Sequence, residues 1–487
     1  RPPPLPSAMA WARRASKGLA GAGAAAVVPA LDVWWGDVPP GRARADGLVD
    51  SYWPTACREP LLARRALGAA RAEARVCVVG GGMAGLHTAL GLAERGVPCV
   101  VLEAQRVGWG ASGLSKGEVV AGLQVEGEDL SRRIGEQASA ELESLTRAAQ
   151  EELLQRIERH SIQCDARAQG TVVISVVGAE GGCGEGEEEG LQSWDRAKAQ
   201  RVVGSPLARG GQFDSSVWAV NPLALTLGLA RAAESCGARV FEGTEATGLE
   251  QGADGRWTVA TAGGGAVVCD EVVLCGSAHL RHGLSRRLAV ATVPVFTWMV
   301  ATEPLNSAQR KSINGGCLED TPTVCNDLVS LNYWRFMPDG RLLFGGLAHA
   351  FPLSLERVES KLRGQMEEHY PQLKGIGIEH VWGGTLSFAM HACPIVGRDG
   401  ATGPWFAAGF GGHGIVPTCM AGELIASGIA EGDERWRLLQ QTLPPSFVFW
   451  PFSRLGAELV LRFFQALDRL RLAGAPLPEW LLPQRPW

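Results

Sequence analysis

The sequence predicts an α/β fold in which two domains are interleaved, and three observations support this. Residues 75–104 contain an apolar run, a glycine-rich stretch, a helical pattern and a second apolar run. A second helix-to-strand pattern opens at an Asn-Pro start signal and covers 221–243. Strand-like stretches such as 170–177 and 341–347 lie between and beyond these parts. Two domains threaded through each other explain this order better than two domains in tandem.

The N-terminal 1–74 predict a leader followed by a polar, irregular lead-in. Arg13 and Arg14 precede small apolar residues, 18–31, which are too few to span a bilayer. An Arg-rich, acid-poor segment is typical of an organelle address, and a twin-arginine signal fits as well. The alternative is a flexible, low-complexity leader. We expect an organellar protein, with a chloroplast, including thylakoid association, favoured over a mitochondrion.

The elements that follow are predicted from their periodicity. Residues 129–160 indicate one or two helices, with apolar positions on one face. The like-charged, glycine-rich stretch 178–190 predicts a surface loop. Further expected elements are short strands within 256–278, a helix at 354–369 and a tail helix at 455–471.

Composition excludes two classes of function. The 46 basic and 51 acidic residues include no basic patch interleaved with aromatic residues, so we expect no nucleic-acid partner. The 12 cysteines show no C-x-x-C pair and no zinc spacing, so we expect neither a metal site nor a disulfide framework.

The glycines after the first apolar run carry the strongest functional signal. Gly80, Gly82 and Gly85 form G-x-G-x-x-G, with Met83 and Ala84 inside the motif, between a strand and the expected helix "LHTALGLAER" (86–95). In a dinucleotide-binding unit the first glycine makes a tight turn, the second admits a pyrophosphate, and the third lets helix and strand pack closely. The helix N-terminus then offers N–H groups to the phosphates.

Glu103 ends the second apolar run 18 residues after Gly85, next to Ala104. A carboxylate at this position can accept hydrogen bonds from an adenosine ribose. The strand, the helix and the acid together predict a dinucleotide site, but they do not identify the dinucleotide.

Longer stretches resemble a known family. "VVLEAQRVGWGASG" (100–113) resembles the FAD-dependent D-amino-acid oxidase (DAO) superfamily. "NPLALTLGLARAA", "EVVLCGSA", "LLFGG" and "GFGGHGIVPTCMAGELIASGIAEGDERWR" are similar to its gamma-glutamylputrescine oxidase-like branch. The resemblance covers about residues 50–440.

The resemblance implies FAD as the cofactor and a DAO/glycine-oxidase-like architecture. It implies a Rossmann-type FAD-binding domain built from 75–125, 215–280 and 383–432. A mixed-sheet α+β substrate domain would comprise 126–214 and 281–382, which leaves 433–487 as a helical tail. The FAD-binding residues that we expect are Gly80, Gly82, Met83, Ala84, Gly85, Glu103, Ala104, Gly110, Ala111, Ser112, Gly113, Gly117, Gly411, Gly412, His413, Gly414 and Ile415.

A second glycine loop, "GFGGHG" (409–414), precedes an apolar helix that begins near Ile415. Its N–H groups could face the flavin O2 edge and stabilise negative charge on the reduced ring. The alternative is a plain loop before a helix. His413 either donates to the flavin or fills a polar pocket.

The loop expected along the flavin departs from the family pattern G-A-S-G-R-N-G-G. This chain has Leu114, Ser115 and Lys116 before Gly117. A lysine beside the flavin would favour the anionic reduced ring. Alternatively, Lys116 faces solvent in a protein whose chemistry no longer matters.

Two further stretches contain weaker candidates. Cys393 could carry FAD covalently, although a buried thiol is the safer interpretation, and His391 is a similar pocket candidate. Tyr333 and Arg335 could form an aromatic wall and a carboxylate clamp, with Lys116 and His413 as the other catalytic candidates. Equally, Trp334 could be core and Arg335 a surface ion pair.

The resulting hypothesis is an FAD-dependent oxidase or dehydrogenase of amines or amino acids. A hydride passes from the α-carbon to flavin N5, the imine hydrolyses, and dioxygen reoxidises the flavin. The alternative is a weakly catalytic or non-catalytic flavoprotein subunit of an organellar complex, docked through its leader or its apolar tail.

Overall fold

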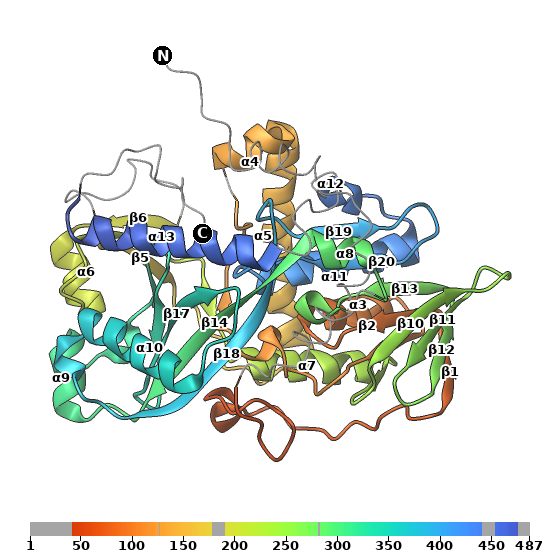
Figure 1. Cartoon of the computed structure of the whole chain (residues 1–487), viewed down its shortest axis with the longest axis horizontal. Helices are drawn as coiled ribbons and strands as arrows, with labels where there is room; N and C mark the ends of the chain where they lie inside the picture. The colour runs from red at the N-terminus through yellow and green to blue at the C-terminus, as the bar shows by residue number, and fades with distance from the viewer. Residues whose placement is uncertain (1–40, 126, 178–189, 281–282, 441–452, 476–487) are drawn as a thin grey trace.

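The computed structural model describes residues 41–125, 127–177, 190–280, 283–440 and 453–475. It confirms the predicted α/β class, because a mainly parallel sheet with helices lies beside a large mixed sheet (Figure 1). The leader and almost all of the glycine- and acid-rich stretch 178–190 lie outside the described residues. The expected interleaving is visible, since the chain passes from one sheet to the other and back.

Within the described residues, the first sheet has the order β19-β20-β13-β2-β3-β9. All neighbouring strands are parallel except the antiparallel edge pair β19 and β20. The strands are β2 (Val76–Val79), β3 (Cys99–Leu102), β9 (Arg239–Phe241), β13 (Glu271–Leu274), β19 (Ile395–Arg398) and β20 (Trp405–Ala408). A parallel sheet places the carboxyl ends of its strands at one edge, which is where such folds bind ligands.

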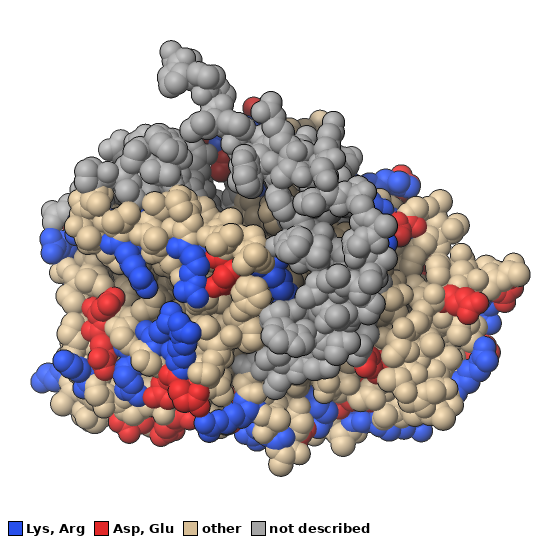
Figure 2. All heavy atoms as spheres, in the orientation of Figure 1, with Lys and Arg blue, Asp and Glu red and all other residues tan. Residues whose placement is uncertain are grey.

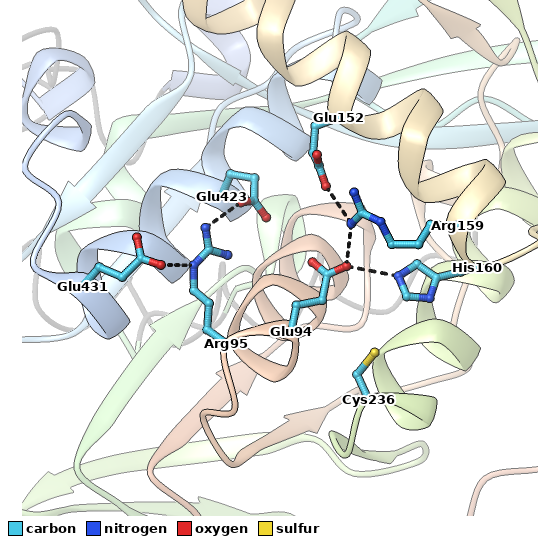
Figure 3. Close-up of a pocket in the computed structure, with 8 residues that line it drawn as sticks. All are labelled: Glu94, Arg95, Glu152, Arg159, His160, Cys236, Glu423 and Glu431. Carbon is cyan, nitrogen blue, oxygen red and sulfur yellow. Dashed lines mark hydrogen bonds and ion pairs between the residues drawn. The ribbon is translucent and has the colours of Figure 1, made fainter.

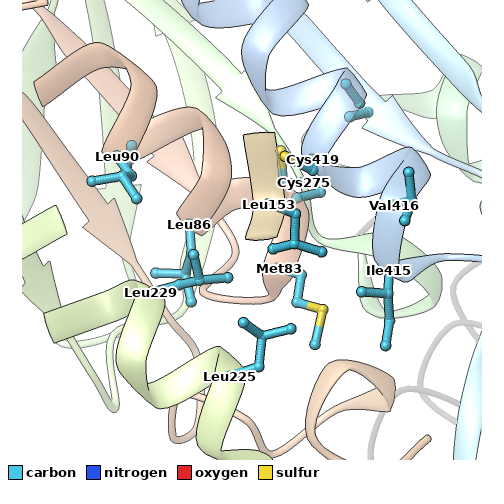
Figure 4. Packing of buried hydrophobic residues seen from close by; sticks show 14 of the residues in the cluster. Met83, Leu86, Leu90, Leu153, Leu225, Leu229, Cys275, Ile415, Val416 and Cys419 are labelled. Carbon is cyan, nitrogen blue, oxygen red and sulfur yellow. The ribbon is translucent and has the colours of Figure 1, made fainter. Parts of the chain in front are cut away.

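Three buried helices pack together against this sheet. They are α3 (Met83–Glu94), α7 (Pro222–Ser235) and α11 (Ile415–Glu431). Figure 4 shows their side chains interdigitating, with Met83 and Ile415, the first residues of α3 and α11, near Leu225 of α7. All three helices are apolar around most of their circumference, as expected of helices enclosed by protein.

A smaller sheet has the order β1-β12-β11-β10. Its strands are β1 (Arg71–Glu73), β10 (Ala246–Gln251), β11 (Trp257–Thr261) and β12 (Ala266–Cys269). It extends to one end of the molecule in Figure 1.

The large mixed sheet has the order β18-β14-β17-β16-β15-β5-β7-β6. Its strands are β5 (Thr171–Ser175), β6 (Leu191–Trp194), β7 (Gly210–Asp214), β14 (Thr292–Thr302), β15 (Thr323–Asn326), β16 (Tyr333–Phe336), β17 (Leu342–His349) and β18 (Ile378–Ala389). The strands β4 (Glu118–Val119) and β8 (Trp218–Ala219) form a separate antiparallel two-stranded ribbon.

The remaining helices are shorter or more peripheral, apart from the 24-residue α5. They are α4 (Gly127–Ile134), α5 (Glu136–Arg159), α6 (Arg196–Val203), α8 (Arg286–Ala291), α9 (Ser307–Asn314), α10 (Leu355–His369), α12 (Trp436–Gln440) and α13 (Ser453–Leu472). Short 3-10 turns are η2 (Trp53–Ala56), η3 (Ala111–Gly113), η4 (Ser277–His279), η5 (Leu318–Asp320) and η6 (Pro371–Leu373). α10 and α13 pack against β14 and β17.

The Asn-Pro start signal works as predicted. The side chain of Asn221 accepts a hydrogen bond from the N–H of Ala224 at 3.1 Å, and Pro222 occupies the first turn of α7. The longest strands, β14 and β18, are missing from the sequence prediction. They pair with each other in the sheet, and neither alternates regularly, since β14 is mostly apolar and β18 mixes polar, apolar and glycine residues.

The position of α5 bears on the expected domain boundaries. Its buried Leu142, Ala149 and Leu153 belong to the same core as α3 and α11. Although 126–214 is expected in the substrate domain, this helix therefore packs on the first sheet's helices. All of the expected domain boundaries stay predictions.

Candidate functional site

The first glycine loop owes its sequence to close backbone contacts. Gly80 has φ +110°, and a Cβ there would lie 2.5 Å from the carbonyl oxygen of Cys275. A Cβ at Gly85 would lie 2.0 Å from the carbonyl oxygen of Gly80. Larger residues at either position would force the turn away from the strands. The loop thus leaves β2 at the sheet edge and enters α3 at once.

Glu103 holds the loop from the neighbouring strand. Its carboxylate accepts hydrogen bonds from the N–H groups of Gly81 at 2.7 Å and Gln105 at 2.8 Å. Burial raises its pKa, the charge of Glu242 adds to the rise, and these two N–H groups partly offset it. A carboxylate accepts about four hydrogen bonds, so lone pairs remain for a ribose. That role stays a prediction, as does any contact of the exposed Ala104.

The 110–113 turn is fixed at the start of α3. The Oγ of Ser112 accepts a hydrogen bond from the N–H of Met83 at 3.0 Å. A Cβ at Gly82 would lie 3.1 Å from that Oγ, and one at Gly113 would lie 2.0 Å from the carbonyl oxygen of Gly108. By contrast, a Cβ at Gly110 would meet nothing within 4 Å. The turn therefore packs tightly on one side and leaves room on the other.

The second glycine loop reaches the same edge of the sheet. The loop follows β20, which pairs in parallel with β13, and it enters α11 at Ile415. Neither Gly82 nor Gly414, the N-cap residues of α3 and α11, has a side-chain cap. A Cβ at the exposed Gly412 would meet nothing within 4 Å. Two helix N-termini therefore present backbone donors and positive dipole ends at this edge.

His413 is the polar side chain of this loop. The backbone carbonyls of Val120 and Ala121 hold its imidazole, and its Nε2 is buried without a hydrogen-bond partner. Burial lowers its pKa, partly offset by the charge of Glu118 and by these carbonyls. His413 is therefore neutral near pH 7 and has one ring nitrogen available.

These features fit a flavin dinucleotide. The glycine loops give close backbone approach, and two of their buried polar atoms lack partners, the Oγ of Ser115 and the Nε2 of His413. Both atoms belong to the loops expected along the flavin. Buried polar atoms normally have partners, so each marks a position where a ligand group can complete a hydrogen bond.

Lys116 does not face solvent, since its side chain is only 7 % exposed. Its Nζ lies 2.7 Å from the Oε1 of Glu118 and 3.1 Å from the Sγ of Cys325, and 5.5 Å from the ring centre of Tyr333. Burial alone would lower the pKa of Lys116, but Cys325 and Glu118 more than offset it, so the pKa is raised. The ammonium is thus neutralised within the protein.

Glu118 completes this buried pair. It accepts hydrogen bonds from the hydroxyls of Thr171, at 2.9 Å, and Thr323. Burial would raise its pKa, but Lys116 and the hydroxyls lower it overall. Glu118, Cys325 and both threonines are absent from the residues predicted from sequence. Spacing carried no signal for Glu118, because Lys116 lies outside β4 and Gly117, at φ +87°, separates the two residues.

Arg335 is neither a surface residue nor half of an ion pair. Its Nη1 donates to the carbonyl oxygens of Lys116 at 3.0 Å and Val220 at 2.9 Å, and its Cζ lies 5.7 Å from the ring centre of Trp53. Burial lowers its pKa to about 10. Arg335 therefore positions the loop before Gly117, and a carboxylate clamp stays a prediction.

The other aromatic candidates divide as expected. Trp334 is a core residue whose Nε1 donates to the hydroxyl of Tyr370 at 2.8 Å. Tyr333 lies beside Cys325 on the neighbouring strand, and burial raises its pKa. Its ring contacts the Lys116 ammonium, so an aromatic wall at this site stays a prediction that the geometry supports.

Cys393 and His391 form a small unit of their own. The N–H of Cys393 donates to the Nδ1 of His391 at 3.1 Å, and Cys393 is only 2 % exposed. Burial raises the pKa of Cys393 to about 11, so the thiol is protonated and weakly nucleophilic near pH 7. A covalent flavin link stays a prediction. All cysteines in the described part of the chain are free, and no metal-binding cluster occurs there.

A separate surface cavity of about 660 Å³ lies at the other end of α3. Figure 3 shows its lining, in which Glu94 and Arg95 at the end of α3 face Arg159, His160 and Glu423 across ion pairs. α3 has 12 residues and is about 18 Å long, so this cavity is remote from the glycine loops. Its charged groups are paired among themselves, and it is not part of the site.

Comparisons with known proteins agree with this geometry. The family described as DAO, FAD dependent oxidoreductase, matches residues 75–427. A probable oxidoreductase, OrdL, of Haemophilus influenzae is 31% identical over 82% of this chain and 93% of its own. The gamma-glutamylputrescine oxidoreductase of Escherichia coli is 31% identical over 81% of this chain and 93% of its own.

Solved structures share the fold. Glycine oxidase from Bacillus cereus superposes with a TM-score of 0.61 at 20% identity, covering 76% of this chain and 99% of its own. L-proline dehydrogenase from P. horikoshii gives a TM-score of 0.59 at 18% identity, covering 76% of this chain and 96% of its own. Together with the two glycine loops, the family match over most of the chain shows that this protein belongs to the DAO family of FAD-dependent oxidoreductases.

Proposed function

We propose that this flavoenzyme oxidises the C–N bond of a primary or secondary amine or of an amino acid. Two similar proteins, a gamma-glutamylputrescine oxidoreductase and a glycine oxidase, are named for substrates of this class. The observation that carries the proposal is a neutral acceptor beside a charge-balanced pair. His413 is neutral with a free Nε2, and the nearby Lys116 and Glu118 neutralise each other.

Such a site suits an uncharged amine. The Nε2 of His413 can accept a hydrogen bond from the N–H of the amine substrate. This contact would orient the lone pair of the substrate nitrogen toward the α-carbon of the substrate. Glu118 does not stabilise the protonated form of the amine, because its negative charge is balanced by Lys116. Bound FAD, held by the glycine loops, would supply the two-electron acceptor for the α-carbon hydride, with dioxygen as the proposed final oxidant. The protein orients the C–H bond and excludes water, and the released imine hydrolyses.

The test begins with the absorbance spectrum of the purified protein and anaerobic addition of a panel of amines and amino acids. Bleaching of the flavin band by one compound identifies the substrate class. A flavin band that no member of the panel reduces would overturn the proposal and favour a non-catalytic subunit. Release of peroxide under air then separates an oxidase from a dehydrogenase.

A variant pair connects this activity to the residue. His413→Phe keeps a ring but removes the acceptor, and we expect kcat/KM to fall about 10²-fold with flavin content unchanged. His380→Gln is the control, because this half-buried histidine lies 3.7 Å from Asp50 and belongs to neither glycine loop. Equal activity of the two variants would exclude the role given to His413.

A further inference from the structure

Helix α13 attaches to the large sheet through polar groups. Glu458 accepts a hydrogen bond from the N–H of Ala350 at 2.8 Å. One side chain of the last turns, Asp468, accepts from the N–H groups of Val329 at 3.2 Å and Ser330 at 2.6 Å. Both acids of this 20-residue helix therefore point toward the protein. A helix on a protein surface normally turns its apolar face inward, whereas this one turns both acids inward beside the buried Leu467.

The outward face of α13 is apolar. Several large side chains are about half exposed or more, and the spacing of Leu455, Leu459 and Phe463 places them on one face. The outer stripe consists of Leu455 (52 %), Leu459 (63 %), Phe463 (50 %) and Leu470 (47 %), and Val460 (49 %) and Leu472 (46 %) are exposed elsewhere on the helix. A continuous exposed patch of this kind marks an interaction surface, whereas single exposed apolar residues do not.

Basic side chains border the outer stripe. Arg462 and Arg469 of α13 are exposed, and Arg357 and Lys361 of α10 lie on the adjacent helix. Figure 2 shows Lys and Arg, with an acidic side chain among them, along the edge of α13 that faces α10, beneath a band without charge. Burial lowers the pKa of Lys361, and Arg462, Arg357 and Arg469 lower it further against the opposing charge of Glu458. Glu458 pairs with Arg462 at 2.8 Å, so Arg357, Lys361 and Arg469 supply the positive charge of the border.

We propose that the outer stripe of α13 and its basic border bind an anionic lipid surface. An interfacial helix lies in the membrane plane with leucine and phenylalanine in the acyl boundary and arginine or lysine among the headgroups. Here the acids face the protein, so the outward half presents apolar and positive groups. The lipid headgroup supplies the negative charge and the acyl region accepts the stripe.

The contact is peripheral. No helix in the described residues is both long and apolar enough to cross a bilayer. α13 instead has 20 residues, about 30 Å in length, held flat against the sheet by Glu458 and Asp468. This inference stands on different residues from the proposed activity, so either can fail alone.

The test is co-sedimentation of the full-length flavoprotein with vesicles of phosphatidylcholine alone or with one third phosphatidylglycerol. We expect the wild type to bind the anionic vesicles at least tenfold more tightly, and added salt to weaken binding. Leu459→Ser/Phe463→Ser should reduce binding about tenfold or more. Arg357→Gln/Lys361→Gln should reduce it roughly thirtyfold on anionic vesicles only.

The matched control is Leu61→Ser/Leu62→Ser, which removes two leucines that are 41 % and 40 % exposed outside α13. It should bind as the wild type does. Equal binding to both vesicle types, or equal loss in the control, would overturn the proposal. So would concentration-dependent dimerisation, measured by light scattering, that Leu459→Ser/Phe463→Ser abolishes, because the stripe would then be covered by a second copy of the chain.

Discussion

Replacing Glu118 by Gln should destabilise the protein because it leaves the Lys116 ammonium buried without a counter-charge. The two side chains are 18 % and 7 % exposed, with 2.7 Å between Oε1 and Nζ. The Glu118→Gln change isolates the charge, since an amide oxygen can still accept from the Thr171 and Thr323 hydroxyls. Breaking a buried pair from one side costs about 3–5 kcal/mol, and because the hydrogen bonds are retained we expect a loss of about 3 kcal/mol.

The assay is urea unfolding followed by tryptophan fluorescence at a fixed, saturating FAD concentration. Lys116→Met/Glu118→Gln removes both charges and should return to within about 1 kcal/mol of the wild type. The control is Asp399→Asn, which breaks an exposed pair with Arg287 at 2.9 Å and should cost less than about 1 kcal/mol. A coupling energy below about 0.5 kcal/mol between Lys116 and Glu118 would refute the reasoning.

The same pair predicts a pH dependence. The pKa of Glu118 is lowered from 4.5, so its contribution to stability is full above pH 4.5 and is lost as the pH falls through the folded value. The pKa of Lys116 is raised from 10.5, so its contribution is full below pH 10.5 and is lost as the pH rises through the folded value. Glu118→Gln should remove the acid-side part of this profile.

Two further predictions concern His369 and Gly85. Burial lowers the pKa of His369 from 6.5 to about 4. This group should therefore reduce the free energy of unfolding by about 2 kcal/mol when the pH is lowered from 8 to 5. Urea unfolding at both pH values should show a drop smaller by that amount in His369→Gln, and an unchanged drop would contradict the shift. Gly85→Ala places a Cβ 2.0 Å from the Gly80 carbonyl oxygen and should weaken FAD binding about tenfold or more, measured by flavin absorbance per protein. Gly364→Ala in α10, where a Cβ meets nothing within 4 Å, should retain FAD fully and gain up to about 1 kcal/mol in unfolding free energy.

Local sequence predicted the cofactor loop well. The contact that requires Gly85 is with Gly80, five residues earlier, and the strand and helix around them have distinct periods. The cap at Asn221 is equally local, because a side chain there needs only the next turn of its own helix. The family resemblance, spread over most of the chain, then identified the dinucleotide as FAD.

The environment of Lys116 could not be predicted in this way. Its partner Cys325 lies 209 residues away in sequence, and two strands of the large sheet bring that thiol and Tyr333 beside the ammonium. Sequence left open whether Lys116 would meet the flavin or solvent, and the tertiary structure instead paired it with Glu118. Burial and partner distance decide a charge's effect, and neither is encoded in neighbouring residues.

Sequence by itself determined the strand–glycine–helix unit, the cofactor family and the presence of an amphipathic tail helix. Only the tertiary structure decided which face of α13 points outward and which buried groups share the site with His413. Periodicity shows that a helix has two faces, but a face is buried or exposed only according to what packs on it. In α13, Glu458 and Asp468 accept hydrogen bonds from backbone N–H groups of the underlying sheet region, at Val329, Ser330 and Ala350. The acids therefore face inward and the outer stripe stays exposed.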